Sequence, residues 1–522
     1  MLRNENIAFL EANPDLVWDL IVIGGGASGL ATALEASIKG YDVLLIEAKD
    51  FAAGTSSKST KLIHGGVRYL EQGNLSLVKE ALIERGRIRD NAPHLFTKMA
   101  FVIPCYSIWQ KWKYRIGLKI YDILSGRFNI GKSYWLSTYP TIMRLKNIVD
   151  NQLRGSVVYF DGQFEDARLA IDLAKNIQKN GQFVLNYMEC EEFIHSNNKI
   201  IGIKARDKIQ NKLFNLKAKA IVNATGVFSD QIRNLEGPSE EKFIQASRGS
   251  HLVIRKEHWK SKHALLVPKT KDGRILFCIP WGQHAIIGTT DIKDNNLTLN
   301  PAIEKEEIDF MINTMNDYLN EKIDKSHISA VFAGLRPLVN RKGNTKQFSR
   351  KHKIHLSNSQ LCSVIGGKWT TYRKIGEDVV NTLIKAKLIE PKKGSSKHYA
   401  LNDLVPHIFK ESYKHLKCYG QDFIAMKVQM ENDPSLAIPF HPKINLLPIE
   451  VVWALEKEMA ICIDDILARR TKILFTEPEI AKIIAPQILD YISCYYPISP
   501  EEKTDQLKAF MHLADQFIIN NE

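Results

Sequence analysis

Residues 19–47 contain a strand, a glycine-rich turn, a helix and a second strand in close succession. The apolar run 19–23 predicts a buried strand, and it leads directly into Gly24-Gly25-Gly26-Ala27-Ser28-Gly29, which fits the pattern G-x-G-x-x-G. The residues that follow have a helical composition, and the run 42–46 predicts a second strand ending at Glu47. This order predicts a parallel α/β unit that binds a dinucleotide.

Each glycine of this turn has its own expected role. Gly24 permits the tight turn, Gly26 lets a pyrophosphate approach the backbone, and Gly29 lets the helix pack closely on the strand. The helix N-terminus offers amide groups to the phosphates. Glu47 can accept a hydrogen bond from a ribose hydroxyl, and a carboxylate at this position disfavours the 2′-phosphate of NADP.

Two later segments repeat the strand and glycine pattern. Residues 220–226 form an apolar run that ends in Gly226, and residues 361–365 lead into Gly366-Gly367-Lys368. Taken singly, each is also typical of a tight turn between core elements. Together with the first turn, they predict three strands of one sheet whose carboxyl ends meet a single dinucleotide.

The remaining chain has a different character. Residues 243–292 alternate short apolar runs with turn residues, which predicts antiparallel strands of a second, inserted domain. Residues 391–397 predict a polar linker, and helical composition follows over 448–467 and 478–496.

Composition limits the classes of protein that remain. The 522 residues carry a net charge of +13, which suits a nucleic-acid binder, a membrane-surface protein or an enzyme of anionic substrates. Seven scattered cysteines without a C-x-x-C pair argue against a disulfide framework or a structural zinc site and indicate a reducing compartment. We expect no metal site. The acidic first twenty residues do not fit a signal peptide, and no apolar run approaches the length of a membrane span. We therefore expect any membrane contact to be peripheral.

A series of motifs then resembles one family. They occur in this order: Thr55-Ser56-Ser57, Lys61-Leu62-Ile63-His64-Gly65-Gly66-Val67-Arg68-Tyr69-Leu70, Val222-Asn223-Ala224-Thr225-Gly226, Gly249-Ser250-His251, Ile279-Pro280-Trp281, Ile287-Gly288-Thr289-Thr290-Asp291, Gly334-Leu335-Arg336-Pro337-Leu338, Gly366-Gly367-Lys368-Trp369-Thr370-Thr371-Tyr372-Arg373 and Asp464-Asp465-Ile466-Leu467-Ala468-Arg469-Arg470-Thr471. With the first glycine turn, this series resembles the FAD-dependent, respiratory glycerol-3-phosphate dehydrogenases over most of the chain. Trp369 departs from the family pattern, which usually has leucine there, and 388–450 shows little match.

The resemblance implies an α/β fold with three parts. A Rossmann-like FAD-binding domain over 19–90, 150–235 and 351–388 carries an inserted antiparallel-sheet substrate domain of the D-amino-acid-oxidase type, over 91–149 and 236–350. A helical C-terminal domain spans 398–522. The implied activity is oxidation of sn-glycerol 3-phosphate to dihydroxyacetone phosphate, with electrons passing from FAD to a membrane quinone.

The substrate carries a phosphate dianion, so its site requires fixed cations. Arginine suits this task because its planar guanidinium can donate two hydrogen bonds to one phosphate. The matched motifs supply Arg336, Arg68 with its neighbour Tyr69, and Lys368 as candidates. Arg350 is a further candidate, because it resembles the family arginine that follows the Gly-Leu-Arg-Pro-Leu motif. A solvated surface position is the common alternative for any single arginine.

Oxidation of the alcohol also releases a proton, which a neutral histidine can accept. His251 is the first candidate for this base, and His64 is the second, although its glycine turn suits support of the flavin better. Arg336 could instead stabilise the alkoxide while water or another group takes the proton.

The expected contacts to FAD come from the glycine turns and the polar segment after the second strand. Hydroxyls and backbone amides there can bind phosphates, and the turn before residue 370 can stabilise the reduced flavin. These candidates are Gly24, Gly26, Gly29, Glu47, Thr55, Ser56, Ser57, Lys61, His64, Gly65, Gly66, Gly226, Gly367, Lys368 and Thr370.

The segment 109–121 is the candidate for contact with an anionic membrane surface. Trp109, Trp112, Ile116 and Ile120 recur at helical spacing among lysines and an arginine, although Gly117 weakens a helix. An amphipathic helix packed on the protein's own core is the alternative. We expect a cytoplasmic protein attached peripherally to the inner membrane.

Three other functions remain open at this point. A soluble glycerol-3-phosphate oxidase would share these motifs and pass electrons to oxygen, and a flavin-fold scaffold would lack catalysis. A nucleic-acid binder is disfavoured because no nucleic-acid-binding motif accompanies the charge. Residues 1–391 carry a net charge of +16 and the rest −3, so the positive charge lies where anionic cofactor, substrate and lipid are expected. A homodimer is left open.

Overall fold

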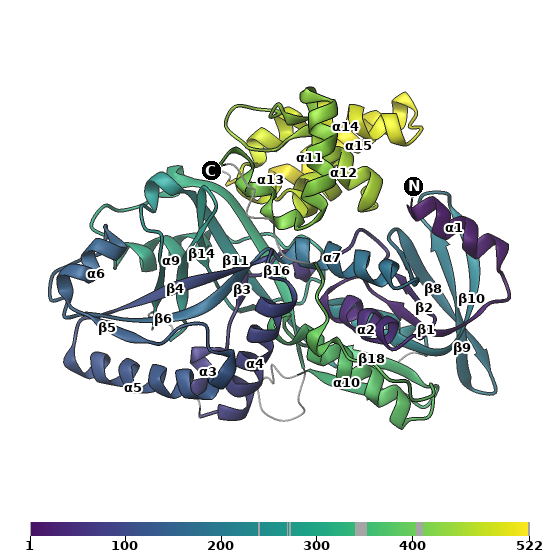
Figure 1. Cartoon of the computed structure of the whole chain (residues 1–522), viewed down its shortest axis with the longest axis horizontal. Coiled ribbons are helices and arrows are strands. Elements are labelled where there is room, and N and C mark those ends of the chain that lie inside the picture. Colours follow the sequence, from purple (N-terminus) through teal and green to yellow (C-terminus); the bar gives the residue numbers. More distant parts are fainter. Residues whose placement is uncertain are drawn as a thin grey trace.

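The computed structural model describes residues 2–71, 73–237, 241–268, 270, 273–339, 352–402 and 411–519. Two β-sheets lie side by side, and a helical C-terminal region covers the junction between them (Figure 1).

The first sheet is parallel at its centre. From edge to edge its strands are β17 (Lys353–Leu356), β18 (Leu361–Ile365), β10 (Lys212–Asn223), β1 (Val17–Ile23), β2 (Val43–Ile46) and β7 (Phe183–Leu185). β10 pairs in parallel with both β1 and β18, so the strands before the three glycine turns are neighbours, as the sequence predicts. β8 (Met188–Ser196) and β9 (Lys199–Asp207) extend the sheet through antiparallel pairing of β9 with β10.

Both faces of β1 are buried, which explains its uninterrupted apolar sequence. Leu20 and Val22 belong to a core with residues of α2 (Ala27–Ile38), α7 (Asp166–Lys179) and α10 (Tyr372–Lys385). The alternate residues of the strand pack on the other side, with β8, β9 and α1 (Leu2–Ala12). This packing fixes the direction of β1 and therefore the position of the turn that follows it.

The second sheet contains the antiparallel strands predicted within 243–292. Its order is β15 (Ile292–Lys293), β11 (Ile244–Arg255), β14 (His284–Gly288), β13 (Leu276–Trp281), β12 (Ala264–Val267), β4 (Phe96–Cys105), β6 (Gly155–Phe164) and β3 (Leu62–Ile63). β16 (Ile328–Val339) pairs along β11, and β5 (Tyr134–Leu136) pairs with β6.

One expected assignment of residues to the two sheets is wrong. The range 150–235 that we assign to the FAD-binding domain includes β6, yet β6 pairs with β4 over its full ten residues in the second sheet. β3, from the range 19–90, pairs with the far end of β6. Both strands therefore belong to the antiparallel sheet, because their backbone hydrogen bonds are made there.

The C-terminal region contains five α-helices among the described residues. They are α11 (Asp422–Asn432), α12 (Pro448–Lys457), α13 (Ile473–Thr476), α14 (Pro478–Tyr495) and α15 (Pro500–Asp515). The helix expected over 448–467 is interrupted, because α12 ends at Lys457 and Met459 has a φ of 55°. The chain then forms a separate π-helical turn, Asp465–Arg470, which contacts Asp50 and Tyr187 in the segments that follow β2 and β7.

The segment proposed for membrane contact forms α5 (Ile108–Ser125) on the outside of the second sheet (Figure 1). Its inner face buries Tyr114, Leu118 and Tyr121. Its outer face exposes large apolar side chains, with Trp109 84% exposed, and includes Ile108, Trp109, Trp112, Ile116, Ile120 and Ile123. The predicted apolar stripe is thus exposed, while the helix packs on the core through its opposite face, as the alternative expects. None of the helices in the described part of the chain has the length and apolar composition of a membrane span.

Candidate active site

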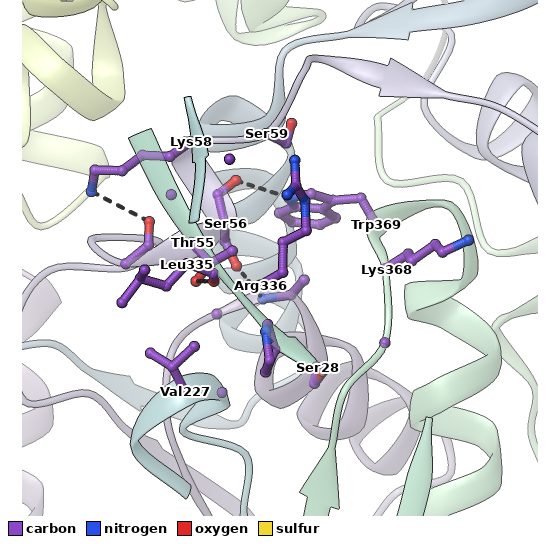
Figure 2. A pocket seen from close by; sticks show the side chains of 18 of the residues that line it. Ser28, Thr55, Ser56, Lys58, Ser59, Val227, Leu335, Arg336, Lys368 and Trp369 are labelled. Carbon is purple, nitrogen blue, oxygen red and sulfur yellow. Dashed lines mark hydrogen bonds between the residues drawn. The ribbon is translucent and has the colours of Figure 1, made fainter. Parts of the chain in front are cut away.

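A cavity of about 600 Å³ lies between the two sheets. The segments that follow β1, β2, β10 and β18 form one part of its wall, and residues of β11, β13 and β16 form another. Figure 2 shows side chains from both parts pointing into this space. The cavity therefore joins the predicted dinucleotide site to the predicted substrate residues.

The first glycine turn has a backbone that other residues could not adopt. Gly24 has a φ of 112°, and a Cβ there would lie 2.7 Å from the Ala224 oxygen. A Cβ on Gly29 would lie 1.9 Å from the Gly24 oxygen. Gly29 is thus required for packing of α2 on the turn and does not line the cavity, while Gly24 and Gly26 do.

Glu47 lies at the end of β2 and lines the cavity. Its carboxylate accepts hydrogen bonds from the amide of Gly25, at 2.7 Å, and from the amide of Lys49, at 2.9 Å. Burial raises the pKa of Glu47, and these two hydrogen bonds oppose the rise. The side chain therefore fixes the glycine turn as well as facing the cavity.

Thr55 and Ser56 line the cavity, and Ser56 lies directly beside the glycine turn. The Ser56 hydroxyl accepts a hydrogen bond from the Ala27 amide at 3.0 Å, and the Thr55 hydroxyl donates to the Leu335 carbonyl at 2.6 Å. The Trp369 indole donates to the Ser56 carbonyl at 2.8 Å, which gives this departure from the family pattern a structural role (Figure 2).

His251, on β11, is a buried residue of the cavity wall. Its Nε2 lies 2.9 Å from the Thr60 hydroxyl, and its Nδ1 has no hydrogen-bond partner among the described residues. The ring stacks on Phe332, the residue directly opposite on β16. Burial and the charges of Arg336 and Lys61 lower the pKa of His251 well below its ordinary value, so the imidazole is neutral near pH 7.

Arg336 extends from β16 into the cavity (Figure 2). Its guanidinium donates hydrogen bonds to the Thr290 carbonyl at 3.0 Å and the Thr289 hydroxyl at 2.8 Å, and lies 3.3 Å from the Asp291 carboxylate. These contacts fix the orientation of the cation. Because the same side chain lines the cavity, it can present a hydrogen-bonding edge to an anion there.

Other predicted residues line the cavity from the segments that follow β3 and β18. The Lys368 ammonium lies 4.1 Å from the centre of the Tyr69 ring, and both residues line the cavity. His64, Gly66, Gly226, Gly367 and Thr370 also line it. The amide of His64 donates to the Thr370 hydroxyl at 3.3 Å, which links the two predicted flavin-binding segments.

Besides Gly29, three predicted contacts to the cofactor are absent from the cavity wall. Lys61 is buried, and its ammonium lies 2.7 Å from the Asp166 carboxylate, so its charge is already neutralised. The Gly65 amide donates to the Tyr121 hydroxyl at 2.8 Å, and Ser57 faces the C-terminal region. In this structure the three residues lie behind the residues that line the cavity, and their contact with the cofactor stays a prediction. Arg350 and the side chain of Arg68 lie outside the described part of the structure.

The sequence analysis missed Lys58 as a residue of the site. Lys58 is 5% exposed, lines the cavity, and donates from its ammonium to the Ala53 carbonyl at 2.7 Å. Burial, followed by the charges of Arg469 and Lys61, lowers the pKa of Lys58 to about 7. The signal available in the sequence was a single lysine inside a segment of small polar residues, which is equally typical of an exposed loop.

The residues present fit FAD. The glycine turn leaves space for a cofactor between Gly26 and Ser56. A side chain at position 26 would narrow this space, because its Cβ would lie 3.1 Å from the Ser56 hydroxyl. α2 begins beside this space. The amide of its first residue, Ala27, donates to the Ser56 hydroxyl, and the N-cap residue provides no side-chain hydrogen bond to the amides that follow. Free amides at a helix N-terminus bind phosphate groups.

Two family models match the chain. The model described as FAD dependent oxidoreductase matches residues 19–372, and that described as the C-terminal domain of alpha-glycerophosphate oxidase matches residues 361–503. The two matches together cover both sheets and most of the C-terminal region.

Relatives and solved structures extend this similarity over the whole length. The mitochondrial glycerol-3-phosphate dehydrogenases of Rattus norvegicus and Homo sapiens are 33% and 32% identical to the chain, over 94% of it and 72% of each relative. The glycerol-3-phosphate dehydrogenase of Bacillus halodurans, solved with FAD, is 25% identical, with a TM-score of 0.80 over 100% of this chain and 99% of that one. The reduced L-alpha-glycerophosphate oxidase of Mycoplasma pneumoniae, at 16% identity and a TM-score of 0.58, shares the fold over 75% of this chain and 100% of its own. The chain belongs to the FAD-dependent oxidoreductases, in the family of the glycerol-3-phosphate dehydrogenases.

Proposed function

We propose that this protein oxidises sn-glycerol 3-phosphate to dihydroxyacetone phosphate with FAD as its cofactor. The observation that carries the proposal is the cavity that joins the FAD-type glycine turn to His251 and Arg336. A basic side chain and a neutral imidazole at one end of such a cavity suit a small phosphorylated alcohol. A scaffold without catalysis would gain nothing from burying these groups in a cavity.

The glycine turn, Glu47, Thr55 and Ser56 would hold the cofactor, and when bound FAD supplies the acceptor for the hydride that leaves C2 of the substrate. Arg336 and Lys368 would bind the substrate phosphate and fix the C2 hydroxyl toward His251. Arg350 and Arg68 are further candidates for phosphate binding. No metal is required by this chemistry.

His251 would accept the hydroxyl proton as the substrate becomes a ketone. The imidazole can do so because its lowered pKa keeps it neutral near pH 7. Thr60, hydrogen-bonded to Nε2, would orient the ring. If His251 served only to orient the substrate, Arg336 would stabilise the alkoxide and water would take the proton.

The electron acceptor that we propose is a membrane quinone, which requires contact with a lipid surface. The exposed face of α5 supports such contact, since six large apolar residues lie on it and Lys113 and Lys119 lie among them. A helix of this kind lies in the plane of an anionic membrane surface without crossing it. We therefore propose peripheral attachment at the inner membrane, on its cytoplasmic side.

Anaerobic mixing of the purified FAD-loaded protein with glycerol 3-phosphate tests the reaction. We expect the flavin absorbance near 450 nm to bleach within the turnover time, with stoichiometric dihydroxyacetone phosphate as product. Glycerol without phosphate is the matched control and should leave the flavin oxidised. An oxidised flavin with both compounds would contradict the proposed substrate.

Reoxidation of the reduced protein then tests the acceptor. A dehydrogenase should reduce a soluble quinone analogue much faster than oxygen, whereas an oxidase would produce peroxide stoichiometrically with substrate. Stoichiometric peroxide would overturn the proposed quinone acceptor and leave the proposed oxidation of glycerol 3-phosphate intact.

A further inference from the structure

The segment Asp50–Lys61 forms one side of the cavity, so its backbone conformation determines the shape of the cofactor site. Its residues on the cavity wall are Ala52, Ala53, Gly54, Thr55, Ser56, Lys58, Ser59 and Thr60. The Ala52 amide donates to the Gly25 carbonyl at 3.0 Å, so the segment is joined directly to the glycine turn. A displacement of this segment would therefore change the phosphate-binding end of the cavity.

The conformation of the segment is one that its sequence does not favour. Ala52 has a φ of 60° and Lys61 a φ of 59°, in the left-handed region that residues with a side chain seldom adopt. Such backbone persists only where surrounding contacts stabilise it. One left-handed residue lies near each end of the segment, so contacts at both ends are needed.

The C-terminal region supplies the contact at the first end. The Asp50 carboxylate is fully buried and accepts hydrogen bonds from both terminal nitrogens of Arg470, with Nη2 at 2.9 Å, and from Nε of Arg469. Asn186 adds a weaker hydrogen bond to the same carboxylate at 3.3 Å. The two arginines lie in the π-helical turn of the C-terminal region, about 420 residues along the chain from Asp50.

The arginines are themselves held within that region. Arg470 Nη2 donates to the Glu458 carbonyl at 2.6 Å, and Arg469 Nη2 donates to Asp464 and Asp465, each at 2.6 Å. Both guanidinium groups are buried. Because a bidentate arginine–carboxylate contact has a defined geometry, guanidinium groups that are held within the C-terminal region also fix the position of Asp50.

The second end of the segment is held differently. Lys61 pairs with Asp166 of α7, which belongs to the same core as the first sheet. Within the segment, Lys58 bonds the Ala53 carbonyl. The ionic contact between the C-terminal arginines and this segment is made at Asp50. The conformation of the Asp50 end therefore depends on the C-terminal region.

We propose that Arg470 and Arg469, acting through Asp50, are positioning residues by which the C-terminal region sets the cofactor-binding conformation of Asp50–Lys61. This inference depends on FAD occupying the cavity, as the proposed function requires. It gives the motif at residues 464–471 a role in cofactor binding, although none of its residues lines the cavity.

The test uses the full-length protein with FAD removed and then titrated back. Arg470→Lys keeps the charge and loses the two-pronged hydrogen bonding, so FAD affinity should fall about tenfold and amide exchange of 51–58 should rise. Asp172→Asn is the matched control, because it alters a second buried carboxylate of the same core, which is hydrogen-bonded to His94 and does not line the cavity. That control should lower the melting temperature and leave FAD affinity and 51–58 exchange unchanged.

The outcomes separate the two proposals. Wild-type protein that binds no FAD contradicts FAD in the cavity. If the wild type binds FAD, and Arg470→Lys has the same FAD affinity and the same amide exchange over 51–58 as the wild type, the positioning role is overturned. If Arg470→Lys does not fold, Arg469→Lys decides in the same assays, because it leaves both bonds from Arg470 to Asp50 in place and should give a smaller loss in FAD affinity. Equal FAD affinity in Arg469→Lys and wild type would then overturn the role.

Discussion

The guanidinium of Arg336 lies against the backbone of Gly249 on the neighbouring strand. A Cβ on Gly249 would lie 2.1 Å from Nη2 of Arg336. The guanidinium can occupy this position in the cavity because residue 249 has no side chain. The two residues are in adjacent antiparallel strands, β11 and β16, which makes their separation a property of the sheet.

Gly249→Ala should therefore lower activity with little change in stability. The added methyl displaces a flexible guanidinium, and misplacement of a substrate-binding group by about 1 Å costs on the order of 100-fold in kcat/KM. The free energy of unfolding should change by less than about 1 kcal/mol. Gly117→Ala on α5 is the control, because a Cβ there would have its nearest neighbour at 3.9 Å. Equal kcat/KM in both variants would contradict the role of Arg336.

Replacement of His251 tests the proposed base. Removal of a general base lowers kcat by roughly 100- to 10,000-fold, and His251→Gln should fall in this range. Since the pKa of His251 is lowered well below its ordinary 6.5, protonation of this residue should reduce wild-type kcat/KM only in acid, and not between pH 6.5 and 8. Thr60→Val, which removes only the hydrogen bond to Nε2, should have a smaller effect. A His251→Gln enzyme with wild-type turnover would exclude the residue as base.

Lys58 should make the stability of the FAD-free protein depend on pH. Its folded pKa is about 7, well below the ordinary value of a lysine, so between about pH 7 and pH 10 the unfolded chain binds more protons than the folded one. The free energy of unfolding should then rise with pH across this interval, by at most about 1.4 kcal/mol per pH unit from this residue.

Urea unfolding of the FAD-free protein at pH 7, 8 and 9 measures this rise. Lys58→Met should make the dependence flatter, because the buried ammonium is gone. Lys260→Met removes an exposed lysine and should keep the wild-type slope. Identical slopes in wild type and Lys58→Met would show that the buried amine does not titrate in this range.

The exposed face of α5 should bind anionic vesicles. Each large apolar side chain that enters the lipid contributes on the order of 1.5–3 kcal/mol, so Trp109→Ser with Trp112→Ser should reduce binding in a flotation assay by at least about tenfold. Higher salt should weaken the remaining binding, since lysines contribute. Ile438→Ser, at an equally exposed site in the C-terminal region, is the control. Undiminished binding by the double tryptophan variant would exclude α5 as the contact.

The sequence predicts those features that depend on neighbouring residues. β1, the glycine turn, α2 and β2 follow one another within 19–47, and helical spacing identifies the exposed face of α5. The shared glycine turns also predict that the distant strands β1, β10 and β18 are neighbours. Contacts between distant side chains were not predictable. Nothing near Lys61 indicates that Asp166, 105 residues away, neutralises it.

The sequence also could not predict which strands pair where an apolar run fits either of the two sheets. The run Gly155–Phe164 reads as a buried strand, but only the structure shows that β4 is its partner. The sequence around Asp50 likewise predicts an ordinary loop carboxylate, and only the structure shows that Arg470, 420 residues later, donates hydrogen bonds to it.

The ion pairs between Asp50 and the C-terminal arginines also connect the unfolding of two parts of the chain. A C-terminal region that melted alone would leave a buried carboxylate without its cations, which is strongly unfavourable. The sheets and the C-terminal helices should therefore unfold in a single cooperative transition on heating. FAD, by stabilising the folded state through mass action, should raise the temperature at which α11–α15 lose their helical signal, although these helices lie outside the cavity that binds it.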